Sequence, residues 1–110
     1  MPTIVISMPA SRLAASEARM DGFIETVVKH CMEIMEVPSD KVQLTFVPVH
    51  EKFHGKPANI HATYRDKASR TKDVVERFMA ALEAAFVPAF GCVPRIRCMP
   101  NDEGKLMARN

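Results

Sequence analysis

The two halves of this chain carry the same succession of sequence patterns. About residues 2–49 and 58–99, each half has a strand-like run, then an amphipathic helix, then a second strand-like run. A chain of 110 residues has the size of one domain, so both halves should share one sheet and one core. Because β-α-β crossovers are right-handed, both helices should cover the same face. The predicted fold class is therefore α/β, with two consecutive β-α-β units forming a four-stranded sheet and two helices on one face.

In the first half, the spacing of apolar residues separates strands from helix. Residues 2–8 form a short apolar run rich in β-branched side chains, which predicts a buried strand. Residues 9–12 are expected to turn. From 13 to 36, apolar residues recur at spacings of three and four, which predicts a helix, and Pro38 forces its exit. Residues 41–49 alternate between apolar and polar, as in a strand with one buried face.

In the second half, residues 58–64 predict the third strand. After a charged turn, Ser69 or Thr71 can cap a second helix, because a hydroxyl oxygen can accept from the free N–H groups of the first turn. Pro88 and Gly91 are expected to end this helix. Four residues mark its buried stripe, namely Val74, Phe78, Leu82 and Phe86.

The last strand is predicted at residues 93–99, where Pro94 favours an edge position. The polar tail 100–110 is expected to be mobile or to dock on a neighbouring subunit. With both helices on one face, the other face of the sheet is expected to be bare and apolar. Such a face needs a partner, so we expect a homo-oligomer.

Charge and cysteine content narrow the class of protein. The 15 basic and 13 acidic residues leave a net charge of +2, so bulk charge gives no sign of nucleic acid or membrane partners. Cys31, Cys92 and Cys98 are odd in number and lack metal-ligand spacing, which indicates reduced thiols. No basic leader precedes the first apolar run, and no run reaches membrane-span length. These features favour a cytoplasmic protein.

Pro2 is the strongest candidate for a catalytic group. Initiator Met1 is normally removed before a small residue such as proline, and its removal would leave a secondary amine at the start of a strand. An α-amino group has a pKa of about 7.7–8.0, which burial and nearby cations lower toward neutral pH. Such an amine could act as a general base. The simpler interpretation is that Pro2 is only a processing signal.

Together with the repeated pattern, Pro2 and Arg12 resemble the tautomerase superfamily over nearly the whole chain. That superfamily includes 4-oxalocrotonate tautomerase, macrophage migration inhibitory factor, malonate semialdehyde decarboxylase and cis-3-chloroacrylic acid dehalogenase. The segments 11–13 and 64–71, and the helical His30, are most similar to the dehalogenase group. The resemblance implies a homotrimer with Pro2 at the bottom of each pocket and no metal or organic cofactor.

The resemblance also implies a small 2-keto or unsaturated carboxylate as substrate. Arg65 and Arg70 are the best candidates to bind it, since a guanidinium pairs bidentately with a carboxylate. Arg12 and His30 are secondary substrate-binding candidates.

The chain departs from the dehalogenase pattern. Its two arginines are five residues apart, and Asp102 and Glu103 are the only carboxylates near the expected C-terminal Tyr and Glu pair. A keto–enol tautomerase is therefore favoured over a dehalogenase, with a related hydratase or decarboxylase as the alternative.

Two interpretations from other classes compete with this one. The string from His50 to His54 matches the HExxH pattern of zinc hydrolases, and His61 could supply a third ligand. That chemistry needs a helix, whereas Pro48 and Pro57 flank the string, so a polar loop at 50–57 is favoured. A non-catalytic trimer that binds a ligand or partner is the other alternative.

Overall fold

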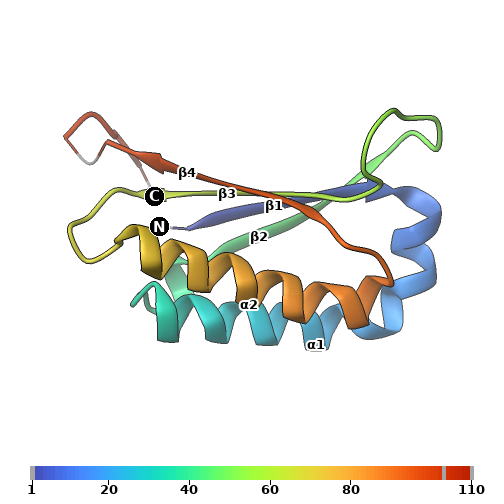
Figure 1. Cartoon of the computed structure of the whole chain (residues 1–110), viewed down its shortest axis with the longest axis horizontal. Helices are drawn as coiled ribbons and strands as arrows, with labels where there is room; N and C mark the ends of the chain where they lie inside the picture. The colour runs from blue at the N-terminus through green and yellow to red at the C-terminus, as the bar shows by residue number, and fades with distance from the viewer. Residues whose placement is uncertain (1, 103, 110) are drawn as a thin grey trace.

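The computed structural model describes residues 2–102 and 104–109. Its elements alternate as two β-α-β units, with a short 3-10 turn in the first (Figure 1). In chain order they are β1 (Thr3–Pro9), α1 (Ala10–Ile34), η1 (Ser39–Lys41), β2 (Gln43–Val49), β3 (Asn59–Arg65), α2 (Lys72–Phe90) and β4 (Arg95–Asn101).

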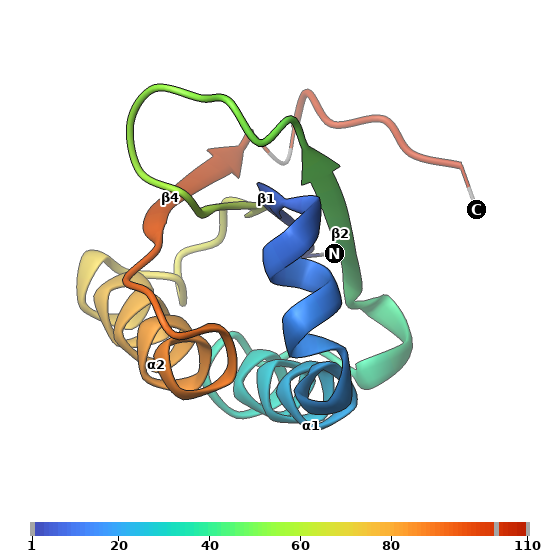
Figure 2. The ribbon, with the colours of Figure 1, turned by 90° about the vertical axis from the view of Figure 1, so that its right-hand side faces the viewer.

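The four strands form one sheet in the order β2-β1-β3-β4. β1 runs parallel to β2, and β3 runs parallel to β4, as right-handed crossovers through a helix require. The two units meet in the middle of the sheet, where β1 and β3 pair antiparallel with Thr3 opposite Thr63. Both helices lie on one face of the sheet (Figure 2). The predicted fold class is confirmed.

The core lies between this sheet and the two helices. Ile4, Ile6 and Met8 alternate along β1 and are fully buried, because that face of the central strand points to the helices. Phe23 and Phe86 meet edge to face with centroids 5.9 Å apart, as aromatic pairs prefer. The predicted stripe of α2 is confirmed at Phe78, Leu82 and Phe86, which are fully buried, while Val74 is half-buried against the cluster.

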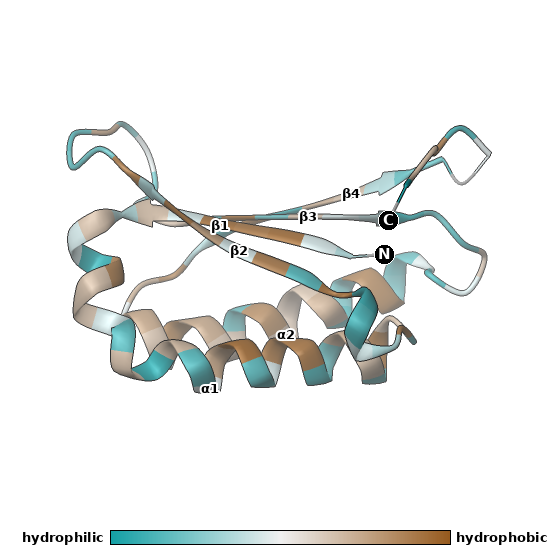
Figure 3. Cartoon of the chain, turned by 180° about the vertical axis from the view of Figure 1, so that it is seen from behind, coloured by the Kyte–Doolittle hydropathy of each residue, from teal (hydrophilic) through white to brown (hydrophobic). Residues whose placement is uncertain are grey.

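Neither of the described helices covers the opposite face of the sheet, as predicted, but that face mixes polar with apolar side chains and is not uniformly apolar. Between the buried residues of β1, the other face carries Thr3, Val5 and Ser7. In register beside Val5 on β3 stands His61, which in turn faces Arg97 on β4. The prediction was wrong because residues 2–8 read as a uniform apolar run, whereas every second residue leaves the core. Burial also alternates along β2 over residues 43–47, and Figure 3 shows paler segments between the brown ones of this strand.

Several element boundaries differ from the prediction. Ala10 to Arg12 form the first turn of α1 instead of a connecting turn, because Pro9 in an extended conformation at the N-cap allows the helix to begin at once. Pro88 lies inside α2 and does not end it. Gly91, with a φ of 74°, ends α2 by donating its N–H to the Val87 carbonyl at 2.8 Å. β4 begins two residues later than expected, after Pro94.

Among the described residues, neither helix is long and apolar enough to cross a membrane.

Candidate active site

Pro2 lies at the entrance of the central strand and is buried. Its carbonyl oxygen accepts a hydrogen bond from the Gln43 N–H at 2.9 Å, which extends the β1–β2 pairing by one residue. Continuing the β1–β3 register from Thr3 and Thr63 sets Pro2 beside Tyr64, one residue before the end of β3. Pro2 is thus hydrogen-bonded to β2 on one side, and on the other side the register extended by one residue leads to β3. Met1 lies outside the described residues.

A cavity of about 450 Å³ opens at this end of the sheet, between the α1–β2 connection and the end of β3. Four basic and two acidic residues line it, so its charge is positive overall. They are Lys41, Arg65, Lys67, Arg70, Glu36 and Asp40.

The structure brings the two predicted arginines together in this cavity. Arg65 is the last residue of β3 and is half-buried, whereas Arg70 is only 7% exposed. Nη1 of Arg70 donates to the Arg65 carbonyl at 2.6 Å, and Nη2 donates to the Met35 carbonyl at 3.2 Å. The guanidinium carbon lies 5.9 Å from the centre of the Tyr64 ring, within the range of a cation–π contact.

Each of these arginines also has one N–H group that makes no hydrogen bond among the described residues. The Nε atoms of Arg65 and Arg70 are buried and have no hydrogen-bond partner among the described residues. A buried donor without a partner costs free energy, and an incoming carboxylate would relieve that cost. The net positive charge of the lining residues also favours a small anion over a cation in the cavity.

Sequence reasoning missed the residues that the α1–β2 connection brings to the cavity. Glu36 follows the C-cap of α1 with a φ of 56°, an uncommon conformation for a residue other than glycine. Asp40 and Lys41 belong to η1. The predicted topology already implied the position of this connection. In a β-α-β unit with parallel strands, the segment between the helix and the second strand lies at the N-terminal end of the first strand, here β1.

Arg12 and His30 lie elsewhere in the chain. His30 is half-buried near the C-terminal end of α1, five residues before Met35, and does not line the cavity. Arg12 is in the first turn of α1, at the opposite end of β1 from Pro2. Its Nη1 donates to the Phe90 carbonyl at 3.1 Å, while Arg19 Nε donates to the Ala89 carbonyl at 2.7 Å. Both arginines thus cap the C-terminal end of α2.

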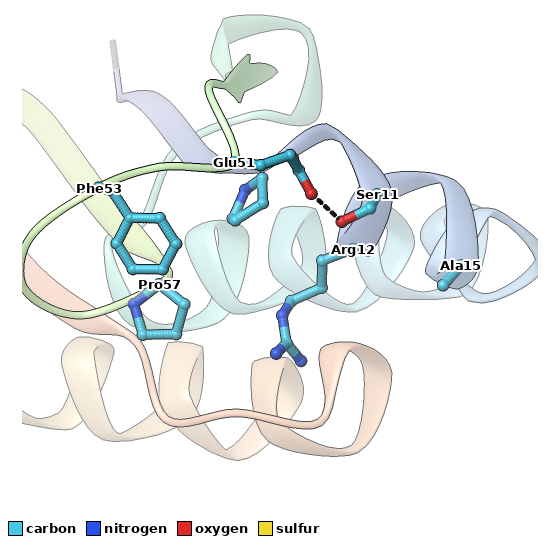
Figure 4. A pocket seen from close by; sticks show the side chains of 7 residues that line it. Ser11, Arg12, Ala15, Glu51, Phe53 and Pro57 are labelled. Carbon is cyan, nitrogen blue, oxygen red and sulfur yellow. Dashed lines mark hydrogen bonds between the residues drawn. The ribbon is translucent and has the colours of Figure 1, made fainter.

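Arg12 also lines a second, open cavity of about 370 Å³ with Ser11, Glu51 and Phe53. In Figure 4 the Ser11 hydroxyl donates to the Glu51 carboxylate, and the Arg12 side chain points away from that pair. The 50–57 segment therefore packs at the end of the sheet opposite Pro2.

The segment from His50 to His54 is an exposed loop, as predicted, without the helix that HExxH chemistry needs. His50 Nδ1 accepts from the Lys52 N–H at 2.9 Å, which fixes a local turn. His61, the third ligand of the zinc hypothesis, lies on the outer face of β3. Over residues 2–102 and 104–109 no cluster of three or more metal-ligating side chains is found.

Burial controls the ionisation of the polar groups in the core. It raises the pKa of the Cys31 and Cys98 thiols to about 11 each. Burial also raises the pKa of Tyr64, with smaller contributions from Cys98 and Asp66, while the Arg70 cation partly opposes the rise. Near neutral pH, therefore, Arg70 faces a neutral tyrosine ring, and neither thiol is a nucleophile.

Architecture and strand order together define the tautomerase fold, also called the macrophage migration inhibitory factor fold. A fused 4-OT wild-type symmetric trimer superposes with a TM-score of 0.79 at 12% identity, covering 97% of this chain and 93% of the other. Macrophage migration inhibitory factor of Toxoplasma gondii gives 0.71 at 14%, with 96% and 95% coverage. Malonate semialdehyde decarboxylase gives 0.67 at 11%, with 98% and 91% coverage.

At these identities the similarity establishes the fold and not the activity. No family model matches the chain, and no curated protein matches it. The resemblance to the dehalogenase group therefore stays a prediction.

Proposed function

We propose that the chain is a member of the tautomerase superfamily and a tautomerase-like enzyme. In this proposal Met1 is removed, and the Pro2 amine acts as general base and acid on a small 2-keto or unsaturated carboxylate. The observation that carries the proposal is the position of Pro2, which is buried at the start of a central strand, at the end of the sheet where the basic cavity opens, although Pro2 is not itself among the residues that line that cavity. Such a terminus is held rigidly, as a catalytic amine must be.

The expected chemistry is the transfer of one proton between carbon and oxygen. The Pro2 nitrogen removes a proton from the carbon next to the carbonyl of the keto form, and the protonated amine then gives that proton to the carbonyl oxygen to form the enol; ketonisation is the reverse. Arg65 binds the carboxylate with its planar fork, and the positive charge of the cavity stabilises the negative charge that develops on oxygen. The same cations favour the neutral amine, because a nearby positive charge opposes protonation.

Arg12 and His30 remain predicted substrate-binding residues with a weaker basis. Arg12 lies at the far end of the sheet from Pro2 and already holds Phe90. It can take part only if assembly brings that end of one subunit to the Pro2 end of another. We propose a homotrimer, a state that the name of the fused 4-OT structure gives for that protein.

Addition of water to an unsaturated acid is the second candidate. It is favoured by the carboxylates of Glu36 and Asp40, which line the same cavity as Arg65. A carboxylate can act as the base that activates a water molecule, while a protonated Pro2 would supply the proton.

Ketonisation of phenylenolpyruvate tests the first proposal. Protein whose mass proves the absence of Met1 is compared with Pro2→Ala, whose primary amine replaces the fixed secondary amine. We expect kcat to fall by about 100-fold or more, the lower range for a general base. Activity that survives in Pro2→Ala would identify another catalytic group. Activity that a chelator abolishes would favour the zinc hypothesis, and no turnover by trimmed protein would favour hydration or a binding role.

A further inference from the structure

We infer that Arg70 is a positioning residue, which holds Arg65 in place to bind the substrate carboxylate instead of contacting the substrate itself. The inference rests on the proposed function, because it assigns different tasks to the two arginines of that site. It concerns two side chains that look alike in the sequence but differ in burial and in hydrogen bonding.

The hydrogen bonds of Arg70 connect the C-terminal end of β3 to the C-terminal end of α1. Its Nη1 bonds the Arg65 carbonyl at 2.6 Å, where β3 ends, and its Nη2 bonds the Met35 carbonyl at 3.2 Å, where α1 ends. The Tyr64 ring lies 5.9 Å from its guanidinium carbon and helps fix the plane of the group. Because a guanidinium is a rigid fork, this bridge sets the position of the Arg65 main chain.

Arg70 is poorly placed to bind a ligand with those same donors. It is 7% exposed, and a carboxylate that paired with its two terminal nitrogens would have to displace both carbonyls. Those carbonyls would then lose their hydrogen-bond partner inside the protein, which is unfavourable.

Arg65 is in the opposite situation. It lines the cavity as a half-buried side chain, and its Nε has no partner among the described residues. Its main-chain carbonyl is fixed by Arg70, whereas no hydrogen bond is found from its side chain within residues 2–102 and 104–109. The main chain of Arg65 is therefore held in place, whereas its guanidinium makes no hydrogen bond among the described residues, which suits it to bind the carboxylate.

A double-mutant cycle separates positioning from direct contact. Binding of phenylacetate, a carboxylate that undergoes no turnover in this reaction, is measured by calorimetry for wild type, Arg65→Ala, Arg70→Ala and the double variant. We expect each single variant to bind about 10-fold or more weakly, as for loss of a hydrogen bond to a charged group. In the Arg65→Ala background, Arg70→Ala should change affinity less than about twofold, because the residue it positions is gone.

Controls keep the result interpretable. Arg77→Ala removes an exposed arginine of α2 and should leave affinity unchanged. If Arg70→Ala does not fold, Arg70→Lys takes its place in the cycle, because lysine keeps the charge but cannot bridge two carbonyls as a fork does. Circular dichroism of each variant confirms the fold before titration.

The outcomes distinguish this inference from the proposed function. Additive losses in the double variant would overturn it, because they would show that Arg70 contacts the ligand directly through its unpaired Nε. Failure of wild type to bind phenylacetate at millimolar concentration would overturn it as well. Coupled losses of binding in a protein that does not ketonise phenylenolpyruvate would support the positioning role and contradict the tautomerase proposal.

Discussion

Cys31 and Cys98 show how single residues respond to the core that surrounds them. Cys31 of α1 lies in the core and Cys98 of β4 packs against it, and burial raises the pKa of each thiol to about 11. A thiol with a raised pKa binds its proton more tightly in the folded than in the unfolded chain. Its contribution to stability is therefore complete below the unfolded pKa and is lost as pH rises through the folded pKa.

This difference predicts an alkaline loss of stability. As pH rises from the unfolded pKa of 9.0 to the folded pKa of about 11, ionisation of each thiol should lower the free energy of unfolding by up to about 3 kcal/mol. Urea unfolding at pH 8, 9, 10 and 11 measures it. The variant Cys31→Ala/Cys98→Ala should show a shallower decline over the same range. Equal slopes for the two proteins would contradict the assignment.

Single residues of the candidate site differ in how far the sequence reveals them. The placement of Arg65 at the end of β3 was predicted correctly, because it depends only on local alternation and a charged turn. The bond from Arg70 to the Met35 carbonyl joins residues 35 positions apart, and no local pattern reports it. The left-handed backbone of Glu36 is equally hidden, since glycine is the residue that usually marks such a position.

At the scale of elements, α2 shows clear start and stop signals. The Thr71 hydroxyl accepts from the Val74 N–H at 3.3 Å, which identifies Thr71 as the N-cap. The sequence also allowed Ser69 as the cap. At the other end Gly91 adopts the left-handed conformation that closes the helix.

The cap predicts a difference between two neighbouring hydroxyl residues. Thr71→Ala should lower the free energy of unfolding by about 1 kcal/mol, the usual cost of losing an N-cap. Ser69→Ala is the matched control, and its effect should stay within about 0.5 kcal/mol because Ser69 is exposed. Urea denaturation of both variants measures the two changes in the free energy of unfolding. A larger loss in Ser69→Ala than in Thr71→Ala would refute the assignment of the cap.

The order and type of the elements were predictable, whereas several of their ends were not. Apolar spacing identifies each helix because it extends over several turns. Pro88 was expected to break α2, yet the helix continues to Phe90. The carbonyls of Ala89 and Phe90 receive hydrogen bonds from Arg19 and Arg12. These partners come from a helix about 70 residues away in sequence, so tertiary contacts support the last turn of α2, and Gly91 ends the helix as predicted.

For the whole molecule, the face of the sheet away from the helices mixes polar side chains with exposed Val47, Val49 and Met99, and we propose that other subunits cover it. Val5 lies near its centre, in register with Thr45 on β2 and His61 on β3. The homotrimer that we propose would bury this face, which a mixture of threonine, serine and histidine side chains permits through hydrogen bonds between subunits.

A charge at the centre of this face should therefore prevent assembly. Sedimentation equilibrium at micromolar concentration should give a trimer for wild type and a monomer for Val5→Asp, because burying a carboxylate between subunits is costly. Val87→Asp, on the exposed side of α2, should remain trimeric. A monomeric wild type, or a trimeric Val5→Asp, would contradict the proposed use of this face.

If the Pro2 amine is catalytic, activity must depend on whether Met1 has been removed. Protein that retains Met1 is treated with methionine aminopeptidase, and samples are taken over time for intact mass and for phenylenolpyruvate ketonisation. If the Pro2 amine is the base, the rate rises in proportion to the fraction of protein that has lost Met1, because an amide nitrogen cannot accept the proton. A rate that is already full before trimming, or that does not change with it, would contradict the account.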